Sequence, residues 1–140
     1  MDDDLPDWPA GTVGLLATTG EDGPHAIPVS TAVRVSGERI VLALAPARAS
    51  LERLRRDPRV AFTVVTGPDV AFTAHGRAAV VADPLPGTGV VAVAIAVVAV
   101  HRHERPTFAI DAGVAWRWTD DGARARDDQV RAALRRLPPA

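Results

Sequence analysis

One short helical pattern lies within a long series of strand patterns between residues 11 and 83, and this order constrains the fold most. Residues 49–56 are rich in arginine, have helical spacing and end before Asp57-Pro58. Five segments rich in apolar and β-branched residues predict strands: 11–18, 25–35, 39–45, 59–66 and 70–83. Asp22-Gly23, between the first two, is a strong hairpin signal. A meander with one helix after its third strand predicts a mostly antiparallel sheet.

Residues 90–100 predict a sixth strand that is buried on both faces. Large β-branched residues alternate there with Ala92, Ala94 and Ala96, and Val97-Val98 breaks the alternation, which predicts a bulge. A strand without a polar face must be covered on both sides. The barrel core covers one side, and either a helix or a second copy of the chain can cover the alanine side. We expect the second copy, which would make the chain a homodimer.

The C-terminal part predicts further strands and a final helix. Strand patterns occur over residues 107–110 and 114–118, and Trp116 and Trp118 would point the same way. We expect these two side chains to pack the last helix onto the barrel rather than to stack on a bound ring. That helix should begin near residues 119–121, and Pro138-Pro139 should end it. Its apolar stripe consists of Val130, Ala133, Leu134 and Leu137.

Together these patterns predict a mainly β protein with α: an antiparallel split β-barrel of six or seven strands, a short helix after the third strand and a C-terminal helix. An SH3-like or oligonucleotide-binding barrel is the alternative. Gly76, inside the fifth strand, predicts a bulge or a close backbone approach. Residues 1–10, in which two prolines flank Trp8, predict an extended N-terminal arm that can tuck against the body. Residues 11–140 are the length of a single domain.

Composition excludes several kinds of chemistry. All 16 basic residues are arginines, so lysine Schiff bases cannot form, and the absence of cysteine removes thiol nucleophiles, disulfides and thiolate metal sites. The formal net charge of −1 and the scarcity of aromatic residues disfavour a nucleic-acid-binding barrel. The four histidines have no spacing that commits to a metal site. The acidic N-terminus and the short apolar runs predict no secretory signal and no membrane span, and therefore a cytoplasmic protein.

Four segments, taken in order, resemble the pyridoxamine 5'-phosphate oxidase-like proteins, which have an FMN-binding split barrel. The segments are Gly11-Thr-Val-Gly-Leu-Leu-Ala-Thr18, Asp22-Gly-Pro-His-Ala-Ile-Pro-Val29, Leu51-Glu-Arg-Leu-Arg-Arg-Asp-Pro-Arg-Val60 and Gly76-Arg-Ala78. The resemblance is clear over residues 11–83 and loose over the C-terminal third. It implies a homodimer that binds FMN, a deazaflavin coenzyme or a tetrapyrrole in a groove at the subunit interface.

The resemblance also implies where such a coenzyme lies. The flavin ring would lie along the second and third strands, at Pro28, Val29, Ser30, Thr31, Leu44 and Ala45. The phosphate would lie near the start of the short helix, at Arg48, Ala49 and Ser50. The family's phosphate lysine aligns with Ser50, and its usual asparagine aligns with Arg53. Ser50 is also the predicted N-cap of this helix, whose free N–H groups could bind an anion together with Arg48.

The sequence supports two hypotheses of function. The first is an FMN- or deazaflavin-dependent oxidoreductase that acts on a small-molecule redox substrate, in which the coenzyme carries the chemistry and no catalytic residue can be named. The second is a non-catalytic split-barrel dimer that has lost the cofactor or binds another ligand such as a tetrapyrrole. Ser50 in place of the lysine favours the second hypothesis.

Overall fold

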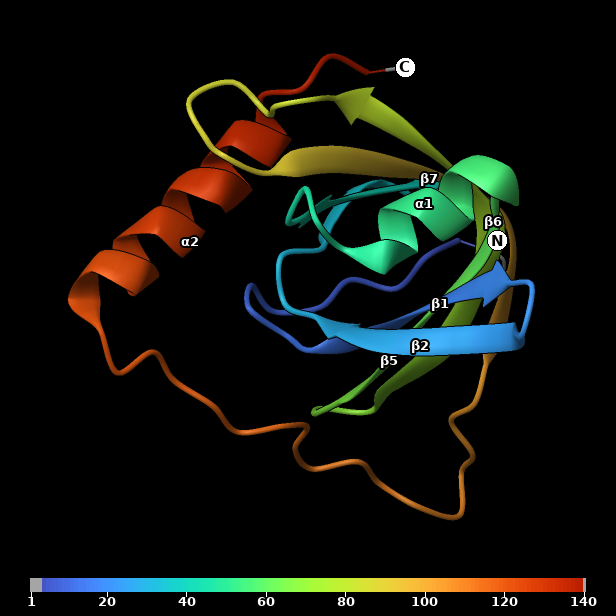
Figure 1. The fold of residues 1–140 in the computed structure, drawn as a ribbon. Helices are drawn as coiled ribbons and strands as arrows, with labels where there is room; N and C mark the ends of the chain where they lie inside the picture. Colours follow the sequence, from blue (N-terminus) through green and yellow to red (C-terminus); the bar gives the residue numbers. More distant parts are fainter. Residues whose placement is uncertain (1–3, 140) are drawn as a thin grey trace.

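The computed structural model describes residues 4–139, which form seven strands and two helices (Figure 1). The elements are β1 (Gly14–Gly20), β2 (Gly23–Val29), β3 (Val33–Ser36), β4 (Arg39–Leu44), α1 (Ala49–Arg56), β5 (Arg59–Thr66), β6 (Val70–Ala82), β7 (Val91–Arg102) and α2 (Asp121–Arg135). None of the described helices is both long enough and apolar enough to span a membrane. The cytoplasmic location stays a prediction.

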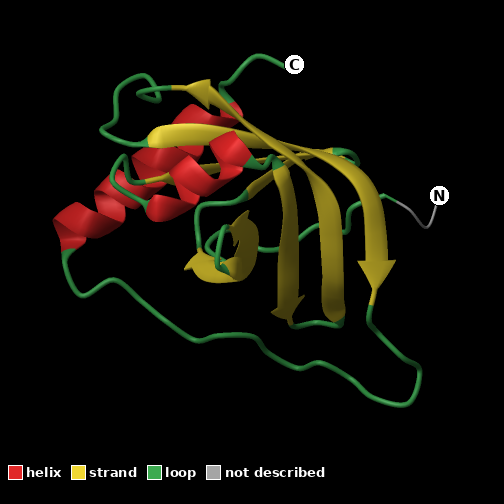
Figure 2. Cartoon of the chain, turned by 45° about the vertical axis from the view of Figure 1, so that its right-hand side comes forward, coloured by secondary structure: helices red, strands yellow, loops and turns green. Residues whose placement is uncertain are grey.

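All seven strands belong to one antiparallel sheet with the order β2-β1-β5-β6-β7-β4-β3. The sheet bends strongly, and its two edge strands do not pair with each other, so the barrel is open (Figure 2). This architecture confirms the predicted split barrel. Pro24 and Pro28 lie in β2, an edge strand, where a residue without an N–H group is tolerated.

The single strand predicted over residues 25–35 is wrong, because the structure divides it into β2 and β3. Thr31, between the two, exchanges hydrogen bonds with Ala43 of β4: the Ala43 N–H donates to Thr31 Oγ1 at 3.1 Å, and Thr31 Oγ1 donates to the Ala43 carbonyl at 3.2 Å. Trp8 Nε1 donates to the Ala32 carbonyl at 3.1 Å. Side chains therefore satisfy backbone groups here that a continuous strand would pair with a neighbouring strand.

The main core fills the barrel, and the N-terminal arm contributes to it. Leu5 and Trp8 are buried, and the Trp8 ring centroid lies 5.6 Å from that of Phe72 and 6.0 Å from that of Phe62. The expectation that Trp8 tucks against the body is confirmed. Residues 1–3 of the predicted arm lie outside the described part of the chain, and the division into an arm and one domain stays a prediction.

A second apolar cluster lies on the outer face of the sheet, where α2 packs on β4 and β7. Ala92 and Ala94 are buried there with Leu134 of α2, whereas Ala96 is exposed. The C-terminal helix is confirmed, and its N-cap Asp120 accepts a hydrogen bond from the Ala123 N–H. The expectation that a second copy covers the alanine face is wrong for Ala92 and Ala94, because a helix of the same chain already covers them.

The strands predicted over residues 107–110 and 114–118 are also wrong. Residues 103–120, here called the C-terminal strap, have no regular secondary structure and cross the open end of the barrel to reach α2 (Figures 1 and 2). Isolated contacts hold the strap: the Asp69 N–H donates to the Ile110 carbonyl at 2.9 Å, and Trp116 Nε1 donates to the Gly11 carbonyl at 2.9 Å. The strap passes so close to Gly67 that a Cβ atom there would lie 2.0 Å from the Asp111 carbonyl oxygen. Composition favoured strands, but the strap crosses other segments instead of pairing alongside one.

Both features predicted for Gly76 are present. The register between β6 and β7 shifts at this glycine, which pairs with Val97 while His75 pairs with Ala99, so Val98 is the extra residue of a bulge. The bulge predicted at Val97-Val98 is thereby confirmed. A Cβ atom on Gly76 would lie 2.3 Å from the Ala96 carbonyl oxygen.

Gly76→Ala should therefore lower the free energy of unfolding by about 1–3 kcal/mol, because the group in the way belongs to the backbone of a central strand. Gly89→Ala is the matched control, since a Cβ atom there meets no atom within 4 Å. Urea unfolding of both variants measures the difference. Equal stability of the two variants would contradict the close approach.

Candidate functional site

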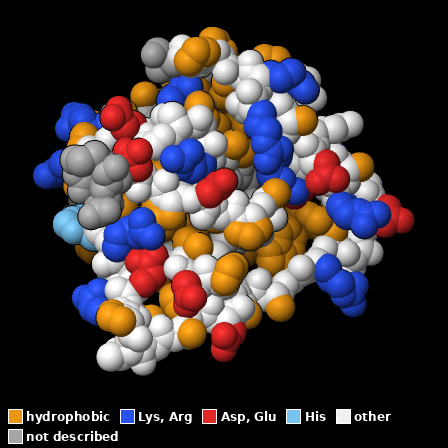
Figure 3. Space-filling view, turned by 180° about the vertical axis from the view of Figure 1, so that it is seen from behind, with side chains coloured by type: hydrophobic (Ala, Val, Ile, Leu, Met, Phe, Trp, Pro, Cys, Tyr) orange, Lys and Arg blue, Asp and Glu red, His pale blue; other side chains and the backbone are white. Residues whose placement is uncertain are grey.

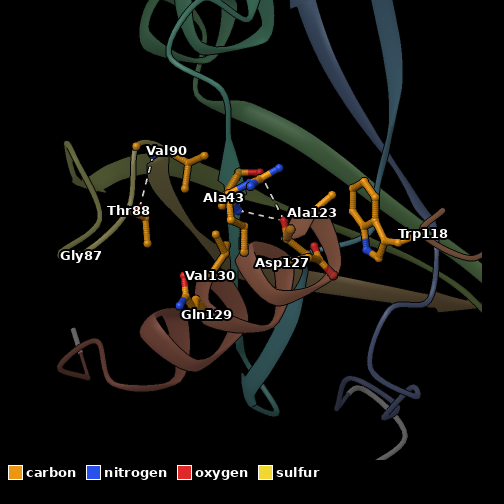
Figure 4. A pocket seen from close by; sticks show the side chains of 12 residues that line it. Ala43, Gly87, Thr88, Val90, Trp118, Ala123, Asp127, Gln129 and Val130 are labelled. Atoms are coloured by element: carbon orange, nitrogen blue, oxygen red, sulfur yellow. Dashed lines mark hydrogen bonds between the residues drawn. The ribbon is translucent and has the colours of Figure 1, made fainter. Parts of the chain in front are cut away.

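A pocket of about 690 Å³ opens between α2, the end of β4, the β2–β3 connection and the β6–β7 turn (Figure 4). Its volume lies within the range of roughly 300–1,000 Å³ that is usual for small-molecule sites. The lining residues are Thr31, Ala43, Gly87, Thr88, Gly89, Val90, Trp118, Ala123, Arg126, Asp127, Gln129 and Val130.

Hydrogen bonds fix the two sides of this pocket that do not belong to α2. The exchange between Thr31 and Ala43 holds the β2–β3 connection against β4. In the β6–β7 turn, Thr88 Oγ1 donates to the Leu85 carbonyl at 2.8 Å and accepts from the Val90 N–H at 3.3 Å. Since these hydroxyl groups already have backbone partners, the sheet side of the pocket presents mainly apolar and backbone surface to a ligand.

A buried ion pair of α2 borders the pocket. Asp127 and Arg131 are one helical turn apart, both are buried, and Arg131 Nη2 lies 2.5 Å from Asp127 Oδ2. The contact does not have hydrogen-bond geometry, so Asp127 Oδ2 has no hydrogen-bond donor among the described residues. Arg131 Nη1 donates to the Ser30 carbonyl at 3.3 Å, which ties α2 to the residue before Thr31. Asp127 thus faces the pocket with its charge balanced by Arg131.

Arg126 is the cation among the residues that line the pocket. Its side chain is exposed, and no carboxylate oxygen of the described residues lies within 4 Å of its guanidinium nitrogens. The pocket therefore combines apolar walls with one positive charge that no carboxylate balances.

The residues predicted to hold the coenzyme ring reach this pocket only in part. Thr31 lines it, whereas Ser30 does not, and the Ser30 carbonyl accepts a hydrogen bond from Arg131. Leu44 points into the main core, whereas Ala43 lies on the outer face and lines the pocket, because successive strand residues face opposite sides. The remaining ring residues do not line it: Pro28 and Ala45 are exposed, and Val29 is buried in the core.

The residues predicted to bind phosphate are not in the pocket. Arg48 is the exposed N-cap of α1 and has an extended backbone, as expected for a residue outside the helix. Ser50 as N-cap is wrong: it is buried inside the helix, because the Leu51 N–H already donates to the Arg48 carbonyl at 3.1 Å and starts the first turn earlier. Ala49, beside Ser50, is exposed.

Arg53 lies instead in a second groove, between α1 and the β1–β2 hairpin, of about 760 Å³. Four carboxylates line this groove against two guanidinium groups: Glu21, Asp22, Glu52 and Asp57 against Arg53 and Arg56. The hydrogen bond from His25 lowers the pKa of Asp22, and the hydrogen bond from Arg59 lowers the pKa of Asp57 to about 2. Both shifts keep Asp22 and Asp57 charged near neutral pH. Because carboxylates also outnumber guanidinium groups in the lining, the groove disfavours a phosphate.

The histidines lie in separate small clusters. His25 contacts Asp22 at 2.8 Å, His103 contacts the Thr73 hydroxyl at 2.8 Å, and His75 packs edge-on against His101. Within residues 4–139, no group of three or more histidine, cysteine, aspartate or glutamate side chains is arranged to hold a metal ion.

Sequence reasoning missed the α2 wall of the pocket. Trp118 lines it, although we expected that side chain to serve in packing only. Asp127 was the signal in the sequence that could have indicated this wall. With Arg131 it lies on the same helical face as Val130 and Leu134, and burying a charged side chain on an apolar face is costly unless the charge is paired.

Comparison with known proteins gives a family and a fold. The sequence model of pyridoxamine 5'-phosphate oxidase matches residues 7–110. No match was found among the curated proteins. The α2 residues that line the pocket, and Trp118, lie beyond the matched region.

Three solved structures illustrate the shared fold. A FAD-binding protein from Mesorhizobium loti is 20% identical, and the match has a TM-score of 0.53 and covers 65% of this chain and 84% of that chain. A protein named F420 reductase is 19% identical, with a TM-score of 0.58 and coverage of 71% and 100%. The General Stress Protein 26 from Bacillus anthracis is 14% identical, with a TM-score of 0.53 and coverage of 65% and 83%.

Asp127→Ala should destabilise the protein by about 3–5 kcal/mol, because it leaves the buried Arg131 guanidinium without its main partner. Asp128→Ala removes the other carboxylate that contacts Arg131, at 3.1 Å, but Asp128 is exposed and its loss should cost less than about 1 kcal/mol. Chemical unfolding of both variants tests this asymmetry. A similar small loss for both would mean that the buried pair is energetically equivalent to a surface pair.

Proposed function

Because the chain belongs to the pyridoxamine 5'-phosphate oxidase family, we propose that it binds a flavin-type coenzyme, FMN or a deazaflavin, between α2 and β4 and acts as an oxidoreductase. The main support for this proposal is that Thr31, a position assigned to the coenzyme ring by resemblance, lines a pocket large enough for a small molecule. Two proteins that share the fold are named for FAD binding and for F420 reduction, which supports a coenzyme of this class.

The residues present fit such a coenzyme. A planar ring needs apolar walls, and Val90, Val130 and Trp118 provide them (Figure 4). Its polar edge needs hydrogen-bonding groups, and Asp127 and Gln129 can provide these from α2. When bound, the coenzyme supplies the hydride chemistry, and the protein supplies position and electrostatics.

The chain's own residues then bind, orient and shield the coenzyme. Helix α2 and the β6–β7 turn form walls that limit access of water to the pocket. Asp127 lines the pocket beside its ion-pair partner Arg131, and its carboxylate can accept hydrogen bonds from the polar edge of the ring. The Thr31 hydroxyl is engaged by Ala43. The substrate is a small redox-active molecule that approaches the coenzyme from the open side of the pocket.

The alternative is a non-catalytic split-barrel protein that has lost the coenzyme or binds another ligand such as a tetrapyrrole. It is favoured by the fact that Arg48, Ser50 and Arg53 do not line the pocket. A protein that shares the fold is named as a general stress protein, and its name implies no coenzyme.

We also propose that the chain forms a homodimer through the outer face of β1 and β5. Leu15 pairs in register with Thr63, and Thr63 and Val65 point to the same side because they are two residues apart in β5. Leu15 and Val65 are both about half exposed. On the side opposite to the view of Figure 1, hydrophobic side chains line a hollow with charged side chains around it (Figure 3).

Light scattering should give twice the 14.7 kDa mass of one chain, and Val65→Arg should shift the protein to the mass of one chain. Val35→Arg is the control, since Val35 is similarly exposed but lies on β3, at the other edge of the sheet. A monomeric wild-type protein would overturn the homodimer. A dimer that tolerates Val65→Arg would overturn this choice of face.

Titration with FMN, a deazaflavin coenzyme and hemin tests the ligand class, with tryptophan fluorescence and ligand absorbance as readouts. A flavin-type ligand should bind, and Ala123→Trp should weaken its binding by at least about tenfold, because the added ring fills the pocket. Ala125→Trp, on the exposed side of the same helix, should bind like the wild type. Binding of hemin alone would support the alternative, and binding of none would overturn the coenzyme proposal.

A further inference from the structure

A phosphorylated coenzyme needs a cation. The resemblance suggests Arg48 and Arg53, and the lining of the pocket adds Arg126. Arg48 lines neither the pocket nor the second groove. Arg53 lies in the second groove, where carboxylates outnumber guanidinium groups. Only Arg126 is in the wall of the pocket that also contains Thr31 and Trp118.

The surroundings of Arg126 leave its charge available to a ligand. Asp127, the next residue, and Asp128 both contact Arg131 and share its charge, Asp128 at 3.1 Å. At the start of the helix, Asp120 accepts from the Ala123 N–H and Asp121 pairs with Arg124 at 3.5 Å. Among the described residues, no carboxylate oxygen comes within 4 Å of Arg126. The carboxylates near the pocket therefore have other partners.

The guanidinium of Arg126 also lies near the N-terminal end of α2. Its Nη1 atom would be 3.4 Å from a Cβ atom on Gly122, so the side chain lies back over the first turn of the helix. Asp120 Oδ1 would lie 3.1 Å from the same Cβ atom, and this carboxylate offsets the positive end of the helix dipole, so the attraction for an anion comes from the guanidinium itself. Gly122 has no side chain to compete for that space.

From these observations we propose that Arg126 of α2 binds the phosphate of the coenzyme. The inference rests on the proposed function, and it moves the anion contact from the start of α1, where the family resemblance puts it, to a helix outside the matched residues 7–110. A guanidinium can bind a phosphate through two parallel N–H···O hydrogen bonds, which sets orientation as well as affinity. In this arrangement the chain needs no lysine at Ser50.

The test compares FMN with riboflavin, which lacks the phosphate, by calorimetric titration of the wild type and four variants. Arg126→Ala should weaken FMN binding about 10- to 100-fold and change riboflavin binding by less than about threefold. Arg126→Lys should bind FMN with intermediate affinity, because it keeps the charge and loses the bidentate contact. Arg124→Ala, two residues away and outside the pocket, should match the wild type for both ligands, and so should Arg48→Ala.

The outcomes separate this inference from the proposed function. If the wild type binds neither ligand, both proposals are overturned. If the wild type binds FMN but Arg126→Ala weakens both ligands equally or neither, only the phosphate assignment is overturned. If Arg48→Ala is the variant with the phosphate-specific loss, the phosphate lies at α1 and Arg126 has no such role. Because Arg126 is exposed and has no ion pair, Arg126→Ala should unfold like the wild type, which circular dichroism checks.

Discussion

The burial of β4 and β7 on both faces determines the arrangement of the rest of the molecule. In β4, Ile40, Leu42 and Leu44 point into the barrel, while Val41 and Ala43 point outward beneath α2. In β7, large β-branched residues face the barrel and alanines face the helix. A paired set of strands without a polar side has to be covered, and small side chains on the outer face let a helix approach closely. The C-terminal strap is the connection that carries the chain across the barrel to make this contact.

The sequence predicted this constraint but not how it is met. Alternation in residues 90–100 required a cover for the alanine face, yet an apolar face looks the same whether a helix of the same chain or another copy covers it. The strands predicted within the strap were wrong for a related reason, because tryptophan and valine favour strands only where a partner strand is available. Beyond Pro28 and Val29, where β2 ends, the Thr31 side chain takes over hydrogen bonds with the backbone of β4, and the strand pattern of residues 25–35 does not show this.

The candidate site was likewise predictable from the sequence only in part. Of the strand positions suggested by resemblance, Thr31 lines the pocket, whereas Leu44 faces the core and its neighbour Ala43 lines the pocket instead. The phosphate positions depended on where α1 begins, and the N-cap lies two residues earlier than predicted, at Arg48, which buries Ser50 inside the helix. The wall made by α2 could not be found from residues 11–83, since it comes from a segment more than thirty residues beyond them. Shared fold therefore accounts for one side of this pocket, and the chain's own C-terminal segment accounts for its polar groups.

This construction links ligand binding to the docking of α2. Within residues 4–139, the second apolar cluster joins α2 to the sheet, and the hydrogen bond from Arg131 to the Ser30 carbonyl joins it to the β2–β3 connection. A ligand between Ala43 and α2 touches both sides of that junction, so its binding energy adds to the stability of the docked helix. The converse follows from thermodynamic linkage: a change that loosens α2 lowers ligand affinity even where the altered residue does not touch the ligand. The Asp127–Arg131 pair thus contributes to the pocket by holding one wall in position, apart from any hydrogen bond that Asp127 makes within it.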